Sequence, residues 1–286
     1  MPTRFLSPMP PALRCIGLNN MSVLIVIPAR FASSRYPGKP LVALTGSTGK
    51  SQTLIERSWI AATQVAGIDR VVVATDDDRI QAAAVAFGAE VVMTSSACTN
   101  GTERCAEAHA NLGGGFDIVV NLQGDAPLTP AWFIEDLVAG LKADTTADVA
   151  TPVLRCDGRA LNGFKEDRAM GRVGGTTAVF SRDNTAMYFS KEVIPYTDSA
   201  YDDAAETPVF HHVGAYAYRP DALSAYPKWP SGPLETLEGL EQLRFMENNR
   251  RVLCVQVAAR GRQFWELNNP DDVPRLETMM AEMGMP

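Results

Sequence analysis

A cation-rich loop follows the first strongly apolar segment of the chain. Residues 23–28, VLIVIP, form a continuous apolar run, and Arg30, Arg35 and Lys39 follow it at spacings of five and four. A bound polyphosphate needs backbone N–H groups, a flexible turn and a few cations of long reach. The loop therefore predicts a phosphate or carboxylate site, although a solvated surface loop is the alternative. It matches neither GxxxxGK[ST] nor GxGxxG, which disfavours ATPase and dinucleotide-binding functions.

Polar side chains also follow three later apolar runs, after Ala74, Thr94 and Leu122. In a parallel sheet, ligands bind at the carboxyl ends of the strands, so these clusters and the first loop predict one shared crevice. Asp125 is the clearest candidate there, because a strand, a glycine and a carboxylate at the open edge favour a functional site.

Three consecutive carboxylates, Asp76, Asp77 and Asp78, need a separate interpretation. They precede a segment of helical periodicity, where an aspartate commonly caps the first turn. We expect a turn and a helix cap, with at most one of the three near a ligand.

The order of the elements predicts the fold class. Strand and helix patterns alternate over residues 23–125, with strands at 23–28, 69–78, 90–95 and 116–127 and helices at 51–67 and 79–89. This alternation is typical of an α/β, doubly wound, mostly parallel sheet. Residues 157–210 lose the periodicity and are expected to be inserted loops and short strands. A strand at 211–219, a helix at 234–249, a strand at 252–258 and a helix at 270–284 are expected to follow.

Composition bounds the function. The chain has 286 residues, of which 46% are hydrophobic, and we expect one domain over 21–286 after a disordered extension at 1–20. A net charge of −7 disfavours nonspecific nucleic-acid binding, and no apolar run is long enough to span a membrane. Five scattered cysteines without a CxxC pair suggest the reducing cytoplasm.

Several motifs, in order and spacing, resemble one family. They are IPARFASSRYPGKPL, VVVATDDDRI, GAEVVMTS, NGTERCAEA, VVNLQGDAPL, HHVGAYAYR and PLETLEGLEQLR. Together they resemble the CMP-Kdo synthetases, the 3-deoxy-manno-octulosonate (Kdo) cytidylyltransferases, over about residues 23–280. The resemblance implies transfer of CMP from CTP to the anomeric hydroxyl of an acidic sugar, release of pyrophosphate, a Mg²⁺ cofactor and a homodimer formed through residues 157–210.

The resemblance also implies roles for individual residues. Arg30, Ser33, Arg35 and Lys39 would hold the triphosphate; Pro28, Ala29, Asp76, Gly101 and Thr102 would lie beside the nucleoside; Gln123, His212, Tyr216 and Glu241 would face the sugar. Arg30, Lys39 and Asp125 would be catalytic, and Asp125 would bind the metal. Without the resemblance, His212 would be interpreted as a core histidine and Glu241 as a solvated residue.

Four positions depart from the family pattern. They are Glu103 and Asn268, where the family has Asp, Ala126, where it has Glu, and His211, where Lys is common. Asn268 falls where the family has its second metal-binding carboxylate, so metal affinity should fall unless Glu266, Asp271 or Asp272 compensates. These departures suggest a changed acceptor and metal half. A different acidic acceptor, or an inactive nucleotide-binding relative with a regulatory or structural role, are the alternatives to Kdo transfer.

Overall fold

The computed structural model describes residues 21–33, 36–172, 175–262, 265–267 and 269–286. The expected extension at 1–20 and the candidate residues Arg35 and Asn268 lie outside these ranges. The described strands are β1 Val23–Ala29, β2 Ala43–Thr45, β3 Ser51–Thr53, β4 Arg70–Thr75, β5 Glu90–Met93, β6 Ile118–Leu122, β7 Val149–Arg155, β8 Thr176–Phe180, β9 Ala186–Ser190, β10 Phe210–His212, β11 Ala215–Tyr218 and β12 Val252–Val257.

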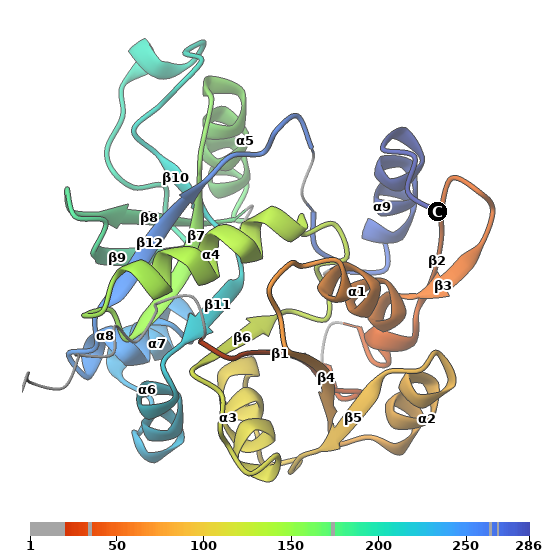
Figure 1. The fold of residues 1–286 in the computed structure, drawn as a ribbon. Coiled ribbons are helices and arrows are strands. Elements are labelled where there is room, and N and C mark those ends of the chain that lie inside the picture. The colour runs from red at the N-terminus through yellow and green to blue at the C-terminus, as the bar shows by residue number, and fades with distance from the viewer. Residues whose placement is uncertain (1–20, 34–35, 173–174, 263–264, 268) are drawn as a thin grey trace, which may run out of the picture.

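All of these strands except the β2–β3 hairpin form one sheet (Figure 1). Its order is β5-β4-β1-β6-β11-β7-β10-β8-β9. Strand β12 lies outside this order and pairs with β7 in parallel. From the pairings, seven of the ten described strands run in one direction, and only β9, β10 and β11 oppose them. The prediction of a mostly parallel α/β sheet is confirmed.

Helices cover both faces of this sheet. They are α1 Leu54–Thr63, α2 Asp78–Ala86, α3 Gly101–Asn111, α4 Ala131–Ala143, α5 Gly158–Ala169, α6 Pro220–Ala225, α7 Pro233–Glu238, α8 Leu243–Glu247 and α9 Asp272–Glu282. Figure 1 shows α1 and α4 on one side of β1 and β6, and α3 on the other.

The apolar run of β1 is continuous because both of its faces are buried. Leu24 and Val26 belong to the core beneath α3, whereas Ile25 and Ile27 belong to the core beneath α1 and α4. A strand covered on both sides has no polar face to alternate with the apolar one. The core therefore fixes β1 firmly, and the loop that follows it starts from a rigid strand end.

The strand order places a topological switch point beside β1. The chain passes from β1 to β4 and β5 on one side, whereas β6 pairs with the opposite edge of β1 in parallel register. Crossover connections diverge there, so the carboxyl ends of β1 and β6 leave an open crevice, the usual ligand position in such sheets.

One expected helix begins later than predicted, and one helix of the insertion was not predicted. The helix expected from residue 51 begins at Leu54, because residues 51–53 pair with β2. Residues 157–210 contain α5 as well as the expected short strands β8 and β9. Helix α5 was missed because its described buried residues are only Gly158 and Leu161, too few to give a clear helical period.

Two elements expected near the C-terminal part of the chain are each divided. The strand at 211–219 is split into β10 and β11, which pair with β7 at its end and at its start respectively. The helix expected at 234–249 is split into α7 and α8 by Gly239, which has φ 62° and ends α7 in the left-handed conformation. This turn sends Glu241 toward the first turn of α3, where its carboxylate meets the Thr102 N–H.

Two further observations concern the environment of the chain. No described helix is long and apolar enough to cross a membrane. The described cysteines, Cys98, Cys105, Cys156 and Cys254, are all free thiols.

Replacement of Gly239 tests the turn between α7 and α8. A Cβ disfavours the left-handed conformation by about 1–2 kcal/mol, so Gly239→Ala should lower the free energy of unfolding by about that amount in urea denaturation. Gly239→Asn is the matched control and should lose less, because asparagine adopts this conformation more readily. Equal stability of the Ala variant and the unchanged protein would contradict the assigned role of the turn.

Candidate active site

A cavity of about 280 Å³ lies at the carboxyl ends of β1 and β6, at the switch point. Eight residues predicted from the sequence line it: Pro28, Ala29, Arg30, Ser33, Lys39, Gly101, Gln123 and Asp125. Six that were not predicted complete its described lining: Pro40, Leu54, Cys98, Asn100, Arg104 and Gly124. Residues that follow β1, β5 and β6 therefore meet at one site, whereas the cluster after Ala74 contributes no residue to the described lining.

An ion pair between Lys39 and Asp125 crosses this cavity. The Lys39 Nζ to Asp125 Oδ2 distance is 2.6 Å, and the two side chains are 16% and 26% exposed. Lys39 begins a 3₁₀ turn, Lys39–Leu41, after Gly38 in the left-handed conformation, and the buried Pro40 anchors that turn. The pair thus links the loop after β1 to the turn after β6.

Backbone contacts fix the position of Asp125. The Ser58 hydroxyl donates to the Gly124 carbonyl at 3.0 Å, and a Cβ on Gly124 would come within 2.9 Å of the Pro28 carbonyl oxygen. The Asp125 carbonyl accepts from the Leu267 N–H at 3.0 Å. Gly124 is therefore required by the close approach of β1, and Leu267 brings the C-terminal segment beside Asp125.

The part of the cavity formed by the start of α3 contains a buried cation that the sequence analysis missed. Arg104 is 3% exposed; its Nη1 donates to Thr94 Oγ1 at 2.6 Å and lies 3.2 Å from Asp76 Oδ1. Asp76 thus contacts the cavity wall through Arg104. The signal for Arg104 was its position four residues after Asn100, the N-cap of α3, since residues at this spacing share a helix face.

Asp77 caps α2 by accepting from the N–H groups of Arg79 and Ile80, which confirms the expected turn and cap.

Glu241 is partly buried and contacts the cavity wall, so the alternative of a solvated residue was wrong. Its Oε2 accepts from the Thr102 N–H at 3.0 Å, and its Oε1 accepts from Gln123 Nε2 at 3.3 Å. Burial raises the pKa of Glu241, with the N–H of Thr102 opposing that shift. The carboxylate therefore accepts a hydrogen bond from the first turn of α3 and also holds the side chain of Gln123, which lines the cavity.

Gly101 allows α3 to approach the strands closely. A Cβ at Gly101 would lie 3.0 Å from Asn121 Nδ2 and 3.2 Å from Gln123 Nε2. A Cβ at this position would require the two amide side chains to shift. The structure therefore gives Gly101 a steric role in addition to its place in the cavity lining.

His212 and Tyr216 lie behind the cavity, in the core. His212 is 6% exposed, its Nε2 is 2.8 Å from Thr151 Oγ1, and burial lowers the pKa of the imidazole to about 3. Tyr216 donates from its hydroxyl to Gln242 Oε1 at 3.0 Å. The geometry supports the interpretation of His212 as a neutral core histidine, and the sugar-facing role of both residues stays a prediction.

Two buried amides of this region have unpartnered atoms. Gln242 Nε2 and Asn121 Oδ1 have no hydrogen-bond partner within the described part of the chain. Buried polar atoms are normally paired with protein, water or ligand. Both residues were missed by the sequence analysis, because their significance comes from burial, which no local pattern reveals.

Three of the four departures from the family pattern lie off the cavity lining. Glu103 accepts from Arg244 Nη1 at 3.0 Å, and Ala126 is 3% exposed. His211 packs against Phe164 at a ring distance of 5.2 Å, and burial lowers its pKa to about 4. None of the three belongs to the described lining, and the fourth, Asn268, is outside the described residues.

The cavity suits a hard divalent cation bound together with phosphate. No group of three or more His, Cys, Asp and Glu side chains occurs in the described ranges, so an all-protein metal cage is not seen there. Asp125 supplies the carboxylate of the described lining, and the Lys39 ammonium shows that a cation is accommodated against it. Mg²⁺ commonly uses one or two carboxylates with phosphate and water oxygens, which fits this donor set.

Comparisons with known proteins place the chain in a family. A model of the cytidylyltransferase family matches residues 24–252. The 3-deoxy-manno-octulosonate cytidylyltransferase of Maricaulis maris is 44% identical over 92% of this chain and 99% of its own length, and that of Syntrophotalea carbinolica is 40% identical over 90% and 98%. The structure of CMP:2-keto-3-deoxy-manno-octonic acid synthetase complexed with CTP superposes with a TM-score of 0.77 at 33% identity, covering 92% of this chain and 99% of that one. This chain therefore belongs to the 3-deoxy-manno-octulosonate cytidylyltransferase family.

Proposed function

We propose that this protein transfers CMP from CTP to the anomeric hydroxyl of Kdo and releases pyrophosphate. The observation that carries the proposal is the cavity at the switch point, where Arg30, Lys39 and Asp125 converge. Two cations on the loop after β1 suit a triphosphate, and the name of the 44% identical relative gives the acceptor. The solved CTP complex, which matches over 92% of this chain, supports the same nucleotide.

The reaction needs positioning and charge neutralisation rather than a protein nucleophile. The sugar hydroxyl oxygen forms a bond to the α-phosphorus, the bond from that phosphorus to the bridging oxygen breaks, and the hydroxyl proton passes to solvent as pyrophosphate leaves. Arg30 and Lys39 would neutralise the triphosphate. Cys98 lines the cavity, but burial and its hydrogen bond to Glu107 raise the pKa of the thiol to about 12, which keeps it protonated.

Asp125 would hold the Mg²⁺ ion, with Asn268 as the second ligand proposed from the resemblance. Bound there, the ion would neutralise phosphate charge and orient the reacting oxygens. Asp125 is suited to this role because backbone contacts from Ser58 and Leu267 fix its turn. Lys39 would exchange its carboxylate partner for phosphate oxygens.

The acceptor half of the site is built around Gln123. Its amide is held by Glu241, and Glu241 is held in turn by the first turn of α3. The three described departures from the family pattern leave this arrangement untouched, which supports Kdo over a different acid. The four cysteines within the described residues are free thiols, which supports a cytoplasmic location.

The insertion supports a homodimer. Of the eight large hydrophobic side chains that are exposed in the described residues, four lie within 157–210: Met170, Met187, Tyr196 and Tyr201. Tyr196 is 90% exposed, and β9, which carries Met187, ends the strand order of the sheet. An inserted segment that exposes several large apolar side chains favours a protein contact over open solvent.

Sugar-dependent pyrophosphate release tests the proposed function directly. With CTP and Mg²⁺ present, we expect release with Kdo and none without sugar, with an acid such as sialic acid as the matched acceptor. Chelation of the metal should abolish release, because the triphosphate charge would then be only partly neutralised. CTP binding without release for any of these acids would favour the inactive relative, and release with the other acid alone would refute Kdo as the acceptor.

Replacement of Asp125 tests the metal assignment. Asp125→Asn keeps the shape but removes the charge, and we expect turnover to fall about 10²–10³-fold, as when one electrostatic stabiliser is lost. Asp136→Asn, on α4 outside the cavity lining, is the control and should keep full activity. Turnover of Asp125→Asn within a few fold of the unchanged protein would exclude Asp125 as the metal ligand.

Sedimentation equilibrium of the whole chain tests the dimer. We expect a dimer that Tyr196→Glu converts to a monomer, because a buried unpaired carboxylate is costly at an apolar interface. Leu237→Glu is the matched control, since Leu237 is 82% exposed but lies on α7, outside the insertion. A monomeric wild-type chain, or a Tyr196→Glu variant that stays dimeric, would contradict the proposed interface.

A further inference from the structure

The loop that carries the cavity cations closes on Phe31. The Phe31 carbonyl accepts from the Gly38 N–H at 2.9 Å, so the two ends of the loop meet. Gly38 has φ 72°, and a Cβ there would lie 3.0 Å from the Phe31 ring. The ring therefore packs directly beneath the residue that precedes Lys39.

A guanidinium covers the Phe31 ring. The Cζ atom of Arg79 lies 3.3 Å from the ring centroid, at cation–π distance. Asp77 holds this guanidinium by two parallel hydrogen bonds, Nε to Oδ1 at 3.0 Å and Nη2 to Oδ2 at 2.7 Å. The paired, planar geometry fixes the plane of the guanidinium over the ring.

Helix α2 is the rigid support of this contact. The same Asp77 carboxylate accepts from the first N–H groups of α2, and Ile80 and Ala84 of that helix are fully buried in the core. The hydrogen bond from Arg79 lowers the pKa of Asp77, so the carboxylate stays ionised and keeps both hydrogen bonds to the guanidinium. A continuous series of contacts thus runs from α2 through Arg79, Phe31 and Gly38 to Lys39.

The contact that joins Arg79 to the loop of the cavity cations is its stacking on Phe31. Its side chain is 61% exposed, and it is absent from the described lining of the cavity. It pairs with Asp77, the N-cap of α2, and stacks on Phe31, which belongs to the loop, so it joins the helix to the loop.

We propose that Arg79 is a positioning residue that clamps Phe31 and so holds the loop of Arg30 and Lys39 in its binding conformation before the triphosphate arrives. The inference deepens the proposed function, because CTP as the ligand comes from it. Without the clamp, the loop would have to be ordered by the nucleotide, and this ordering would weaken binding.

Calorimetric titration of CTP in excess Mg²⁺, without any sugar, measures this effect. We expect Arg79→Gln to weaken CTP binding roughly two- to fivefold, the range for an exposed cation–π contact. The melting temperature is measured on the same samples. A lower melting temperature with unchanged CTP affinity would show a structural role only and would overturn the inference.

A double-mutant cycle with Phe31→Leu separates the clamp from long-range charge. If Arg79 acts through the ring, Arg79→Gln should add nothing to the loss already caused by Phe31→Leu. A general loss of positive charge would instead weaken binding equally in both backgrounds. Additive losses would therefore overturn the proposal.

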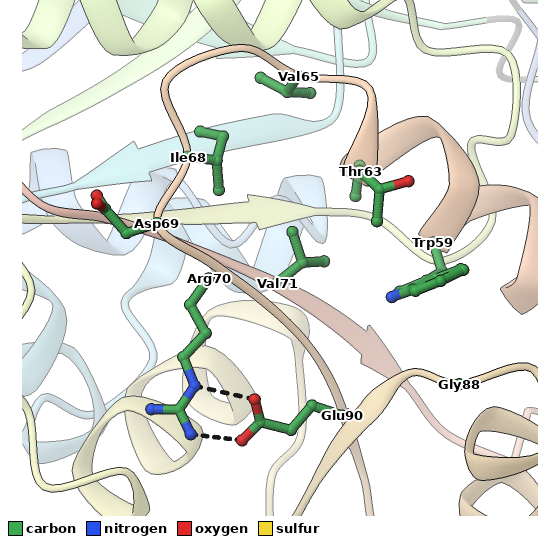
Figure 2. Close-up of a pocket in the computed structure, with 10 residues that line it drawn as sticks. Trp59, Thr63, Val65, Ile68, Asp69, Arg70, Val71, Gly88 and Glu90 are labelled. Carbon is green, nitrogen blue, oxygen red and sulfur yellow. Dashed lines mark hydrogen bonds and ion pairs between the residues drawn. The ribbon is translucent and has the colours of Figure 1, made fainter.

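Arg70→Gln is the matched control. Arg70 forms an exposed ion pair with Glu90 at the amino end of β4, in a shallow pocket that also contains Trp59 (Figure 2). Like Arg79, it is positively charged and forms an ion pair with a carboxylate, but it lies at the opposite end of the strands from the cavity. Arg70→Gln should therefore leave CTP affinity unchanged. Equal losses in the two variants would overturn the clamp.

A wild-type protein that does not bind CTP would refute both the proposed function and this inference, whereas normal binding in Arg79→Gln would refute the inference alone.

Discussion

The ion pair between Lys39 and Asp125 is the contact on which the arrangement of the site depends. It joins the loop after β1 to the turn after β6, two segments separated by more than eighty residues of sequence. Adjacent parallel strands bring their carboxyl ends to the same level, so a cation on one and a carboxylate on the other can meet. Because the pair is only half-buried, water and ligand oxygens can replace either partner, as a substrate-exchanging site requires.

The same pair explains how cations can be gathered in an acidic protein. Arg30, Lys39 and Arg104 all line one cavity of a chain with net charge −7. Asp125 neutralises Lys39, and Asp76 lies beside Arg104, so two of the three clustered cations have a nearby carboxylate before any phosphate is bound, while Arg30 donates to the Thr99 carbonyl. A triphosphate can then take over as the anionic partner without moving the backbone of the strands.

The sequence predicted the residues that follow strands better than the contacts around Glu241, for a physical reason. Residues such as Arg30 and Asp125 follow strands whose apolar runs are unmistakable, so their meeting point comes from topology alone. The contact of Glu241 with Thr102 joins residues 139 apart and depends on the left-handed turn at Gly239, which a helical pattern over 234–249 conceals. Arg79 was missed similarly, since its role depends on a ring 48 positions away in the sequence.

The departures from the family pattern show how sequence position differs from position in the site. Glu103 is next to Thr102 and close in sequence to Gly101, yet it is absent from the described lining of the cavity. One carboxylate oxygen accepts from Arg244, which also pairs with Glu235 at 2.7 Å, and the other accepts from the N–H and hydroxyl of Thr99. The contacts of the Glu103 carboxylate are thus with protein groups, the buried guanidinium of Arg244 and the residue Thr99. Successive residues of a helix face different directions, and a conservative change beside a binding residue can therefore belong to the core. By this argument Glu103, Ala126 and His211 occupy positions outside the described cavity lining, where they contact other protein groups.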